Sequence, residues 1–192
     1  RFNPYICSAR SRIEEQGPVV QLVGEFHKDM STMADQDRFP DQLKDNMLLE
    51  SPIHAIDLVR DIAGGEVEQV NSVVRRVSSP YKTVHAALVK FDNGCVAQLT
   101  AAYTSGGRLE RYEIHGEYIS AYLEGVRSGH IDSGRQQEKL VVKGQPNSIE
   151  AEDRFFIDAV RTDRPIVLPA ANLDEAVKTM ELCEAILSDA RE

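Results

Sequence analysis

Hydrophobic residues recur every three or four positions in four stretches of the chain, and this spacing predicts four helices. The clearest pattern precedes the glycine pair at 64–65, which can end a helix with a left-handed cap. Its apolar positions are Leu49, Ile53, Ile56, Val59 and Ile62. The predicted helices cover residues 4–16, 48–65, 149–161 and 173–189. The second helix either starts at Ser51-Pro52, with Ser51 as its N-cap, or continues through Pro52 with a local kink.

Between residues 66 and 142 the apolar spacing shortens to two, which is the period of a β-strand. Asn93-Gly94 predicts a tight hairpin turn, and the other connections are too short to hold crossover helices. The predicted strands are 19–27, 66–77, 83–91, 95–104, 108–116, 117–125 and 139–144. We therefore expect an α+β fold: an open, predominantly antiparallel β-sheet with helices on one face.

The other face of this sheet is expected to be weakly polar. Along the segment after Asn93, one side carries Val96, Gln98, Thr100, Ala102 and Thr104, with no charged residue among them. Burying such a surface costs little polar desolvation, so it suits a homo-oligomer interface, a dimer or a tetramer. The alternative is an ordinary solvated sheet face.

Residues 28–45 contain five aspartates and show no apolar period. The pattern predicts a long polar loop. Loops of this length are often functional in compact domains, so we expect a rim or lid over a site.

The composition narrows the function further. The 192 residues include 22 Lys and Arg against 31 Asp and Glu, a net charge of −9, which disfavours nucleic acid and anionic membranes as partners. No apolar run is long enough to span a bilayer. Three widely spaced cysteines without a CxxC pair fit reduced thiols and a cytoplasmic location. The length fits a single domain, 1–192.

One group of titratable residues suggests chemistry. Glu50, His54, Asp57 and Asp61 are spaced by four, three and four, so a continuous helix would align them in one stripe. A carboxylate can accept one ring N–H of a histidine and leave the other nitrogen to take a proton from a substrate hydroxyl. His54 is thus a candidate acid/base. A solvated or hydrogen-bonded surface histidine is the competing interpretation.

The remaining histidines and the glycine pairs give no indication of a metal or nucleotide site. His27, His85 and His115 share no short ligand spacing, so we expect no metal site. The glycine pairs fit neither a Gly-x-Gly-x-x-Gly turn nor a phosphate-binding loop. We therefore expect no cofactor-binding residues in this chain.

The segment LLESPIHAIDLVRDIAGG resembles the E-x-x-x-H-x-x-D-L-x-R-x-x-x-G helix of the Gfo/Idh/MocA oxidoreductases, the glucose-fructose oxidoreductase and inositol dehydrogenase family. Its flanks agree, since RFNPYICSARSRIEEQGPVVQLVGEF is similar to the entry segment of the family's C-terminal domain. The hairpins AALVKFDNGCVAQLTAAY and EIHGEYISAYLEG, and the ending FFIDAVRTDRPIVLPAANLDEAVKTMELCEAILSDA, are similar as well. The resemblance covers nearly the whole chain.

The resemblance implies a C-terminal substrate-binding and oligomerisation domain whose N-terminal Rossmann domain, binding NAD or NADP, is absent from this chain. It implies a catalytic role for His54, which would take the proton of the hydroxyl being oxidised in a sugar, cyclitol or similar polyol. Glu50 falls where many members have a substrate-contacting Asp and is one methylene longer, and Asp57 matches the following Asp. Both are expected to serve substrate binding or orientation.

The isolated chain is then expected to bind no cofactor and to be inactive, while the full-length parent would be an NAD(P)-dependent dehydrogenase. Two alternatives stay open. The same scaffold can serve as a non-catalytic dimerisation or ligand-sensing module, or the chain is an independent α+β binding domain.

Overall fold

The computed structural model describes residues 1–29, 39–144 and 147–188. These residues form one eight-stranded sheet in the order β2-β3-β4-β1-β5-β6-β7-β8. The strands are β1 Gln21–Asp29, β2 Val67–Arg75, β3 Val84–Phe91, β4 Val96–Ala102, β5 Thr104–Gly116, β6 Ile119–Glu124, β7 Ser128–Ser133 and β8 Gln136–Lys139. All neighbouring pairs are antiparallel except β1 with β4.

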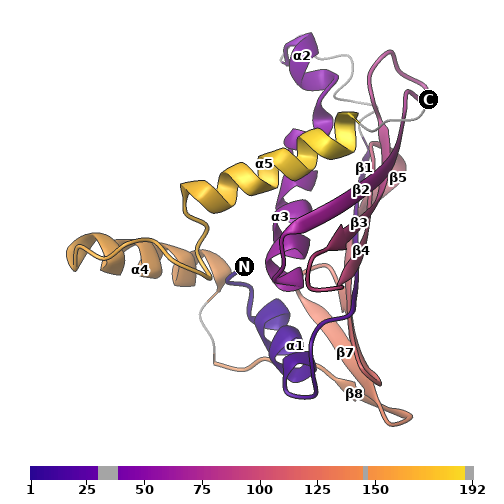
Figure 1. Ribbon diagram of the computed structural model, residues 1–192. Helices are drawn as coiled ribbons and strands as arrows, with labels where there is room; N and C mark the ends of the chain where they lie inside the picture. Colours follow the sequence, from indigo (N-terminus) through magenta and orange to yellow (C-terminus); the bar gives the residue numbers. More distant parts are fainter. Residues whose placement is uncertain (30–38, 145–146, 189–192) are drawn as a thin grey trace.

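The helices are α1 Pro4–Glu14, α2 Asp41–Lys44, the 3-10 turn η1 Met47–Leu49, α3 Pro52–Ala63, α4 Ser148–Arg161 and α5 Leu173–Ser188. Figure 1 shows α1, α3 and α5 against one face of the sheet, whereas α4 projects away from it. The expected fold class, an open and mostly antiparallel α+β sheet with helices on one face, is confirmed.

The core lies between the sheet and these helices. Along β4 the residues Ala97, Leu99 and Ala101 are buried, while the alternate residues are wholly or partly exposed, as the period of two predicts. Helix α3 approaches β1 at Gly24, where a Cβ atom would lie 2.8 Å from Val59 Cγ2. A glycine is therefore needed for the helix to sit this close to the sheet.

The strand order differs from a simple meander. β1 is inserted between β4 and β5, so the chain passes from one side of β1 to the other at Tyr103. Val23 faces Gln98 of β4 in parallel register and Glu113 of β5 in antiparallel register. The pattern of apolar positions identified these strands but carried no information on which pairs would be adjacent.

Several elements differ from the predicted ones, and the strand β7, Ser128–Ser133, was not predicted. The strand predicted at 139–144 is wrong, because the polar segment Gln136–Lys139 pairs with β7 instead. The helix predicted at 48–65 is divided into η1 and α3, because Pro52 at the first turn lacks the N–H that would continue a longer helix. The predicted loop at 28–45 contains α2, and residues 30–38 of that loop lie outside the described residues.

Candidate active site

His54 lies in the first turn of α3, with Pro52 at the helix start. Its side chain is exposed, whereas its neighbours Ala55 and Ile56 are buried against the sheet. Within the described part of the chain, the ring of His54 makes no hydrogen bond. Among the described residues, His54 is therefore an exposed side chain without a hydrogen-bond partner.

Glu50 precedes α3 and is bound by three donors. The ammonium of Lys28 lies 3.3 Å from each carboxylate oxygen, and the hydroxyl of Tyr103 lies 3.3 Å from Oε2. Ser51 donates a further hydrogen bond to the same oxygen. Partial burial would raise the pKa of Glu50, but the Ser51 hydrogen bond and the Lys28 charge hold this pKa below its usual value. Glu50 therefore stays ionised.

Tyr103 connects this cluster to the core. Its side chain is 2% exposed, and its hydroxyl also donates to the backbone carbonyl of Met47 at 2.7 Å. Burial, with Glu50 nearby, raises the pKa of the Tyr103 hydroxyl above its usual value, so it remains a donor. Through Tyr103 and Glu50, the turn that leads into α3 is fixed to the end of β4.

Asp57 faces the opposite direction, toward the chain start and α5. Both of its oxygens accept from the guanidinium of Arg1, at 2.7 and 2.8 Å, and the hydroxyl of Thr179 donates to Oδ1 at 2.8 Å. Burial would raise the pKa of Asp57, but the hydrogen bonds from Arg1 and Thr179 keep it low. This is a bidentate arginine–carboxylate pair in which the Arg1 side chain is only 5% exposed.

Asp61 continues this network one turn later. It accepts from Arg1 at 3.1 Å and from Arg10 at 3.2 Å. Burial raises the pKa of Asp61 above its usual value, and the two arginines oppose this effect. Arg60, the residue before Asp61, donates to Thr179 and Glu175 of α5.

The structure therefore places the four predicted stripe residues in different surroundings. Glu50 lies outside α3, and in the described residues neither Glu50 nor Asp57 is hydrogen-bonded to His54. The carboxylates instead hold the helical segment that carries the histidine at two places, Glu50 just before α3 and Asp57 in the middle of α3. Lys28, Tyr103 and Arg1 were not identified from the sequence, because each is distant in the chain from the residue it binds.

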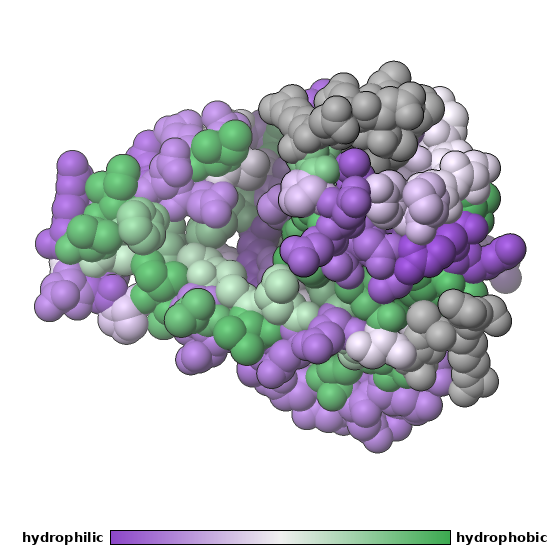
Figure 2. Space-filling model, turned by 90° about the horizontal axis from the view of Figure 1, so that it is seen from above, coloured by the Kyte–Doolittle hydropathy of each residue, from purple (hydrophilic) through white to green (hydrophobic). Residues whose placement is uncertain are grey.

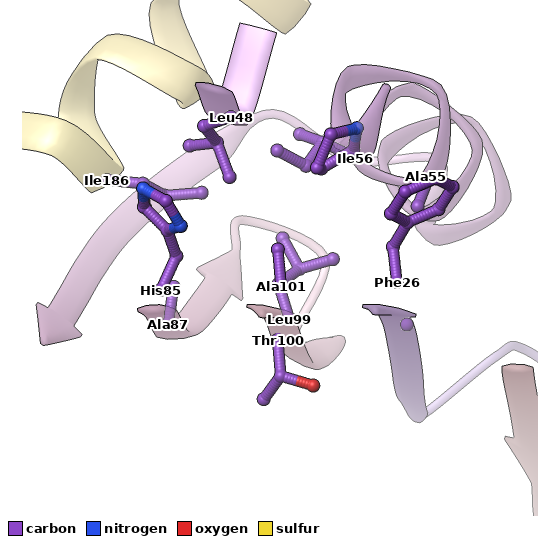
Figure 3. A pocket seen from close by; sticks show the side chains of 12 residues that line it. Phe26, Leu48, Ala55, Ile56, His85, Ala87, Leu99, Thr100, Ala101 and Ile186 are labelled. Atoms are coloured by element: carbon purple, nitrogen blue, oxygen red, sulfur yellow. The ribbon is translucent and has the colours of Figure 1, made fainter. Parts of the chain in front are cut away.

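A small cavity lies beneath the same helix. It has room for about one water molecule, about 10 Å³, and its walls are almost entirely apolar. Figure 3 shows His85 beside Leu48 and Ile186, with Phe26 and Ile56 on the far side. His85 is 2% exposed, and burial lowers its pKa to about 4. A neutral histidine buried here belongs to the core rather than to the exposed site.

Neither a metal nor a dinucleotide finds a site in the described residues. No group of three or more His, Cys, Asp or Glu side chains there can hold a metal ion. A Rossmann site needs successive parallel strands joined through a glycine-rich turn and a helix. The one parallel pair of the described sheet, β1 with β4, has no such connection, so the described residues form no Rossmann-type dinucleotide site. No helix in the described ranges has the length and apolar character to cross a membrane.

A comparison with known protein families identifies the family of this chain. The family model of the GFO/IDH/MocA C-terminal domain matches residues 8–121, more than half of the chain. The chain belongs to the GFO/IDH/MocA family. The match includes β1 and α3, the elements that carry Lys28 and His54.

Solved structures share the fold of this chain along nearly its whole length. Aldose-aldose oxidoreductase from Caulobacter crescentus, complexed with glycerol, has a TM-score of 0.83 at 20% identity, covering 100% of this chain and 59% of that one. UDP-N-acetylglucosamine 3-dehydrogenase from Acidithiobacillus ferrooxidans has a TM-score of 0.80 at 18% identity, and the match covers 98% of this chain and 58% of that one. Levoglucosan dehydrogenase in complex with NADH and L-sorbose has a TM-score of 0.78 at 18% identity, and the match covers 99% of this chain and 61% of that one. The chain thus spans about three fifths of these structures. A comparison with curated proteins found no match.

Proposed function

We propose that this chain is the substrate-binding and acid/base half of an NAD(P)-dependent oxidoreductase that acts on a sugar, cyclitol or similar polyol. The observation that carries the proposal is the exposed His54 ring on the first turn of α3, in a chain of the GFO/IDH/MocA family. The support for a polyol substrate is the shared fold of proteins described as sugar dehydrogenases and oxidoreductases.

The proposed role of His54 is to accept the proton of the substrate hydroxyl that becomes a carbonyl. A general base must be held within hydrogen-bond reach of that proton, and small displacements are costly. The Glu50 cluster before α3 and the Asp57–Arg1 pair in the middle of α3 hold the backbone that carries His54. A nicotinamide bound by another domain supplies the hydride acceptor.

The proposed roles of the two carboxylates differ. Glu50 has a side chain 22% exposed and precedes His54 by one turn, so it can add a substrate hydroxyl to its present donors. Asp57 has both oxygens bound by Arg1, and a substrate would have to displace that pair. We therefore assign Glu50 to substrate contact and Asp57 to orientation of α3.

The test uses the full-length parent. His54→Ala should lower kcat by about 10²- to 10⁴-fold, the usual scale for losing an acid/base. His130→Ala, which alters a partly exposed histidine on β7, is the matched control and should leave kcat unchanged. Full activity of the His54 variant would refute the assignment. Measurable NAD reduction by the 192-residue chain alone would refute the expected need for a second domain.

A non-catalytic dimerisation or ligand-sensing module is the second candidate. It is favoured by the absence, within the described residues, of a carboxylate bound to the His54 ring. The sequence of the parent discriminates the two. A glycine-rich turn after a strand and a Glu-Lys-Pro segment upstream of Arg1 support the enzyme, and their absence supports the module.

We also propose that the open sheet face is the interface of a homo-oligomer. This face is not covered by the helices, and the adjoining strands β2 and β3 expose Val73 and Leu88 at 49% and 46%. Gln98 and Thr100 of β4 continue the same surface, and the neighbouring Glu25 of β1 is ion-paired with Arg111 of β5. The uncharged part of this surface loses little solvation when a second copy covers it.

A further inference from the structure

The turn between β2 and β3, residues 76–83, holds α2 through its side chains. Arg76 directly follows β2 and donates to both carboxylate oxygens of Asp45, with 3.2 Å between Nη2 and Oδ2. The backbone N–H of Lys82 donates to Oδ1 of the same carboxylate at 3.3 Å. The hydrogen bond from Arg76 holds the pKa of Asp45 below its usual value, so Asp45 stays ionised. A bidentate arginine–carboxylate pair with an added backbone donor fixes the orientation of Asp45.

A second contact joins the same two segments at the start of α2. The hydroxyl of Tyr81 donates to Oδ1 of Asp41 at 2.7 Å, and the ammonium of Lys44 lies 5.6 Å from the centroid of the Tyr81 ring. Figure 2 looks down on the end of the molecule where α2 lies in Figure 1, and it shows hydrophilic side chains exposed on that end. The contact between α2 and the turn therefore lies at the surface, outside the apolar core.

The turn also holds the residue that follows β4. The backbone N–H of Tyr103 donates to the carbonyl of Thr83 at 2.8 Å. The hydroxyl of Thr83 accepts from the N–H of Val77 and donates to its carbonyl, both at 3.0 Å, and so closes the turn. Because the hydroxyl of Tyr103 is bound to Glu50, the turn reaches Glu50 from this side as well.

Glu50 thus lies between two arms that start from one turn. In the first arm, η1 joins Asp45 to Glu50, and the N–H of Glu50 donates to the carbonyl of Met47 at 3.0 Å. The second arm is the side chain of Tyr103. Since both arms begin at the turn, a displacement of the turn moves the Glu50 carboxylate relative to α3.

We propose that Arg76 is a positioning residue for the candidate active site, which acts through Asp45 and η1 on the place of the Glu50 carboxylate. The inference rests on the proposed function, in which Glu50 contacts the substrate. A carboxylate displaced by about 1 Å binds a substrate hydroxyl more weakly. His54 is carried by α3, which the turn does not hold directly. Loss of Arg76 should therefore weaken substrate binding and leave the proton transfer to His54 intact.

Arg75 offers a matched control one residue away. An ordinary solvated pair of arginines is the competing interpretation, and it fits Arg75, which is exposed. In the described part of the chain the guanidinium of Arg75 makes no hydrogen bond or ion pair. Arg75→Gln and Arg76→Gln remove the same charge from adjacent positions, so the two variants differ only in the contacts that Arg76 makes.

The first test uses the 192-residue chain and needs no substrate. In the Arg76→Gln variant the amides of Leu49 and Glu50 should exchange with solvent about tenfold faster, because one arm has lost its anchor. The pKa of Glu50, followed by NMR, should rise toward its usual value, since the donors around this carboxylate are no longer held in place. Arg75→Gln should change neither quantity. Exchange at Val59 in α3 should be the same in all forms, which shows that the fold is intact.

The second test measures kinetics of the full-length parent with whichever of myo-inositol, D-glucose and levoglucosan it oxidises. Arg76→Gln should raise KM about fivefold with kcat nearly unchanged, the pattern expected when ground-state binding is lost. Arg75→Gln should leave both unchanged. In a Glu50→Gln background Arg76→Gln should have no further effect on KM, because Arg76 acts through Glu50.

Three results would overturn the proposal: equal exchange in the Arg75 and Arg76 variants, an unaltered Glu50 pKa, or effects of Arg76→Gln and Glu50→Gln on KM that add in full. The proposed function fails separately. If Glu50→Gln leaves KM unchanged, or if none of the three polyols is oxidised, the assignment of Glu50 to substrate contact is wrong. The exchange and pKa measurements then still decide whether Arg76 sets the place of Glu50.

Discussion

His85 provides a quantitative test of the packing beneath α3. The side chain is 2% exposed, and neither ring nitrogen has a hydrogen-bond partner of good geometry in the described residues. Its neighbours in the cavity are apolar, including Leu48 and Ile186. Protonating the ring would leave a cation with no counter-charge in contact, so burial lowers the pKa from 6.5 to about 4.

The sign and size of the effect follow from this shift. As the pH falls, the unfolded chain takes up the proton near pH 6.5 while the folded protein resists until about pH 4, so stability present at pH 7 is lost across this window. At pH 4 the free energy of unfolding has fallen by about 3 kcal/mol through His85, because each unit of pKa difference between the folded and unfolded states corresponds to roughly 1.4 kcal/mol.

The assay is urea unfolding at pH 7 and pH 4 for the wild type and for His85→Leu. Leucine fills a similar volume and removes two unpartnered nitrogens, so the variant should be at least as stable as the wild type at pH 7. It should lose about 3 kcal/mol less than the wild type on acidification, since the remaining groups titrate alike in both proteins. His130→Leu, at an exposed position, is the control and should follow the wild type. Equal acid sensitivity of wild type and His85→Leu would refute the reasoning.

Two further predictions concern the other faces of the domain. Asp57→Asn should lower the free energy of unfolding by about 2 kcal/mol, because it leaves the buried Arg1 without its bidentate carboxylate partner. Arg12→Gln, which removes an exposed ion pair, is the control and should lower it by under about 0.5 kcal/mol. Unchanged stability of the Asp57 variant in chemical denaturation would contradict a structural role. Sedimentation at tens of micromolar should show an oligomer that Leu88→Lys dissociates and Tyr118→Lys does not, and a monomeric wild type would disprove the sheet-face interface.

Most elements of this fold could be predicted because their apolar spacing is regular. The alternation along 95–104 and the period of three to four along 53–62 both reflect burial of one side of an element, and the structure buries that side. β8 was missed because its residues, Gln136–Lys139, are all exposed and carry no apolar signal. The insertion of β1 beside β4 depends on long-range pairing, which alternation within one strand does not encode.

The candidate site could be predicted only in part. The resemblance located His54, and α3 presents it to solvent as a substrate-facing residue would require. The surroundings of Glu50 and Asp57 could not be predicted, because α3 begins at Pro52 and Glu50 lies before it, whereas the stripe assumed one continuous helix. Their partners, Lys28 and Arg1, are 22 and 56 residues away in the chain and meet them only through the fold.

A crystal structure of the full-length protein with dinucleotide and polyol bound tests the central claim most directly. The account predicts a ring nitrogen of His54 about 2.6–3.2 Å from the hydroxyl oxygen to be oxidised, the distance a general base requires. A substrate bound elsewhere, with the His54 ring still directed into solvent, would contradict it.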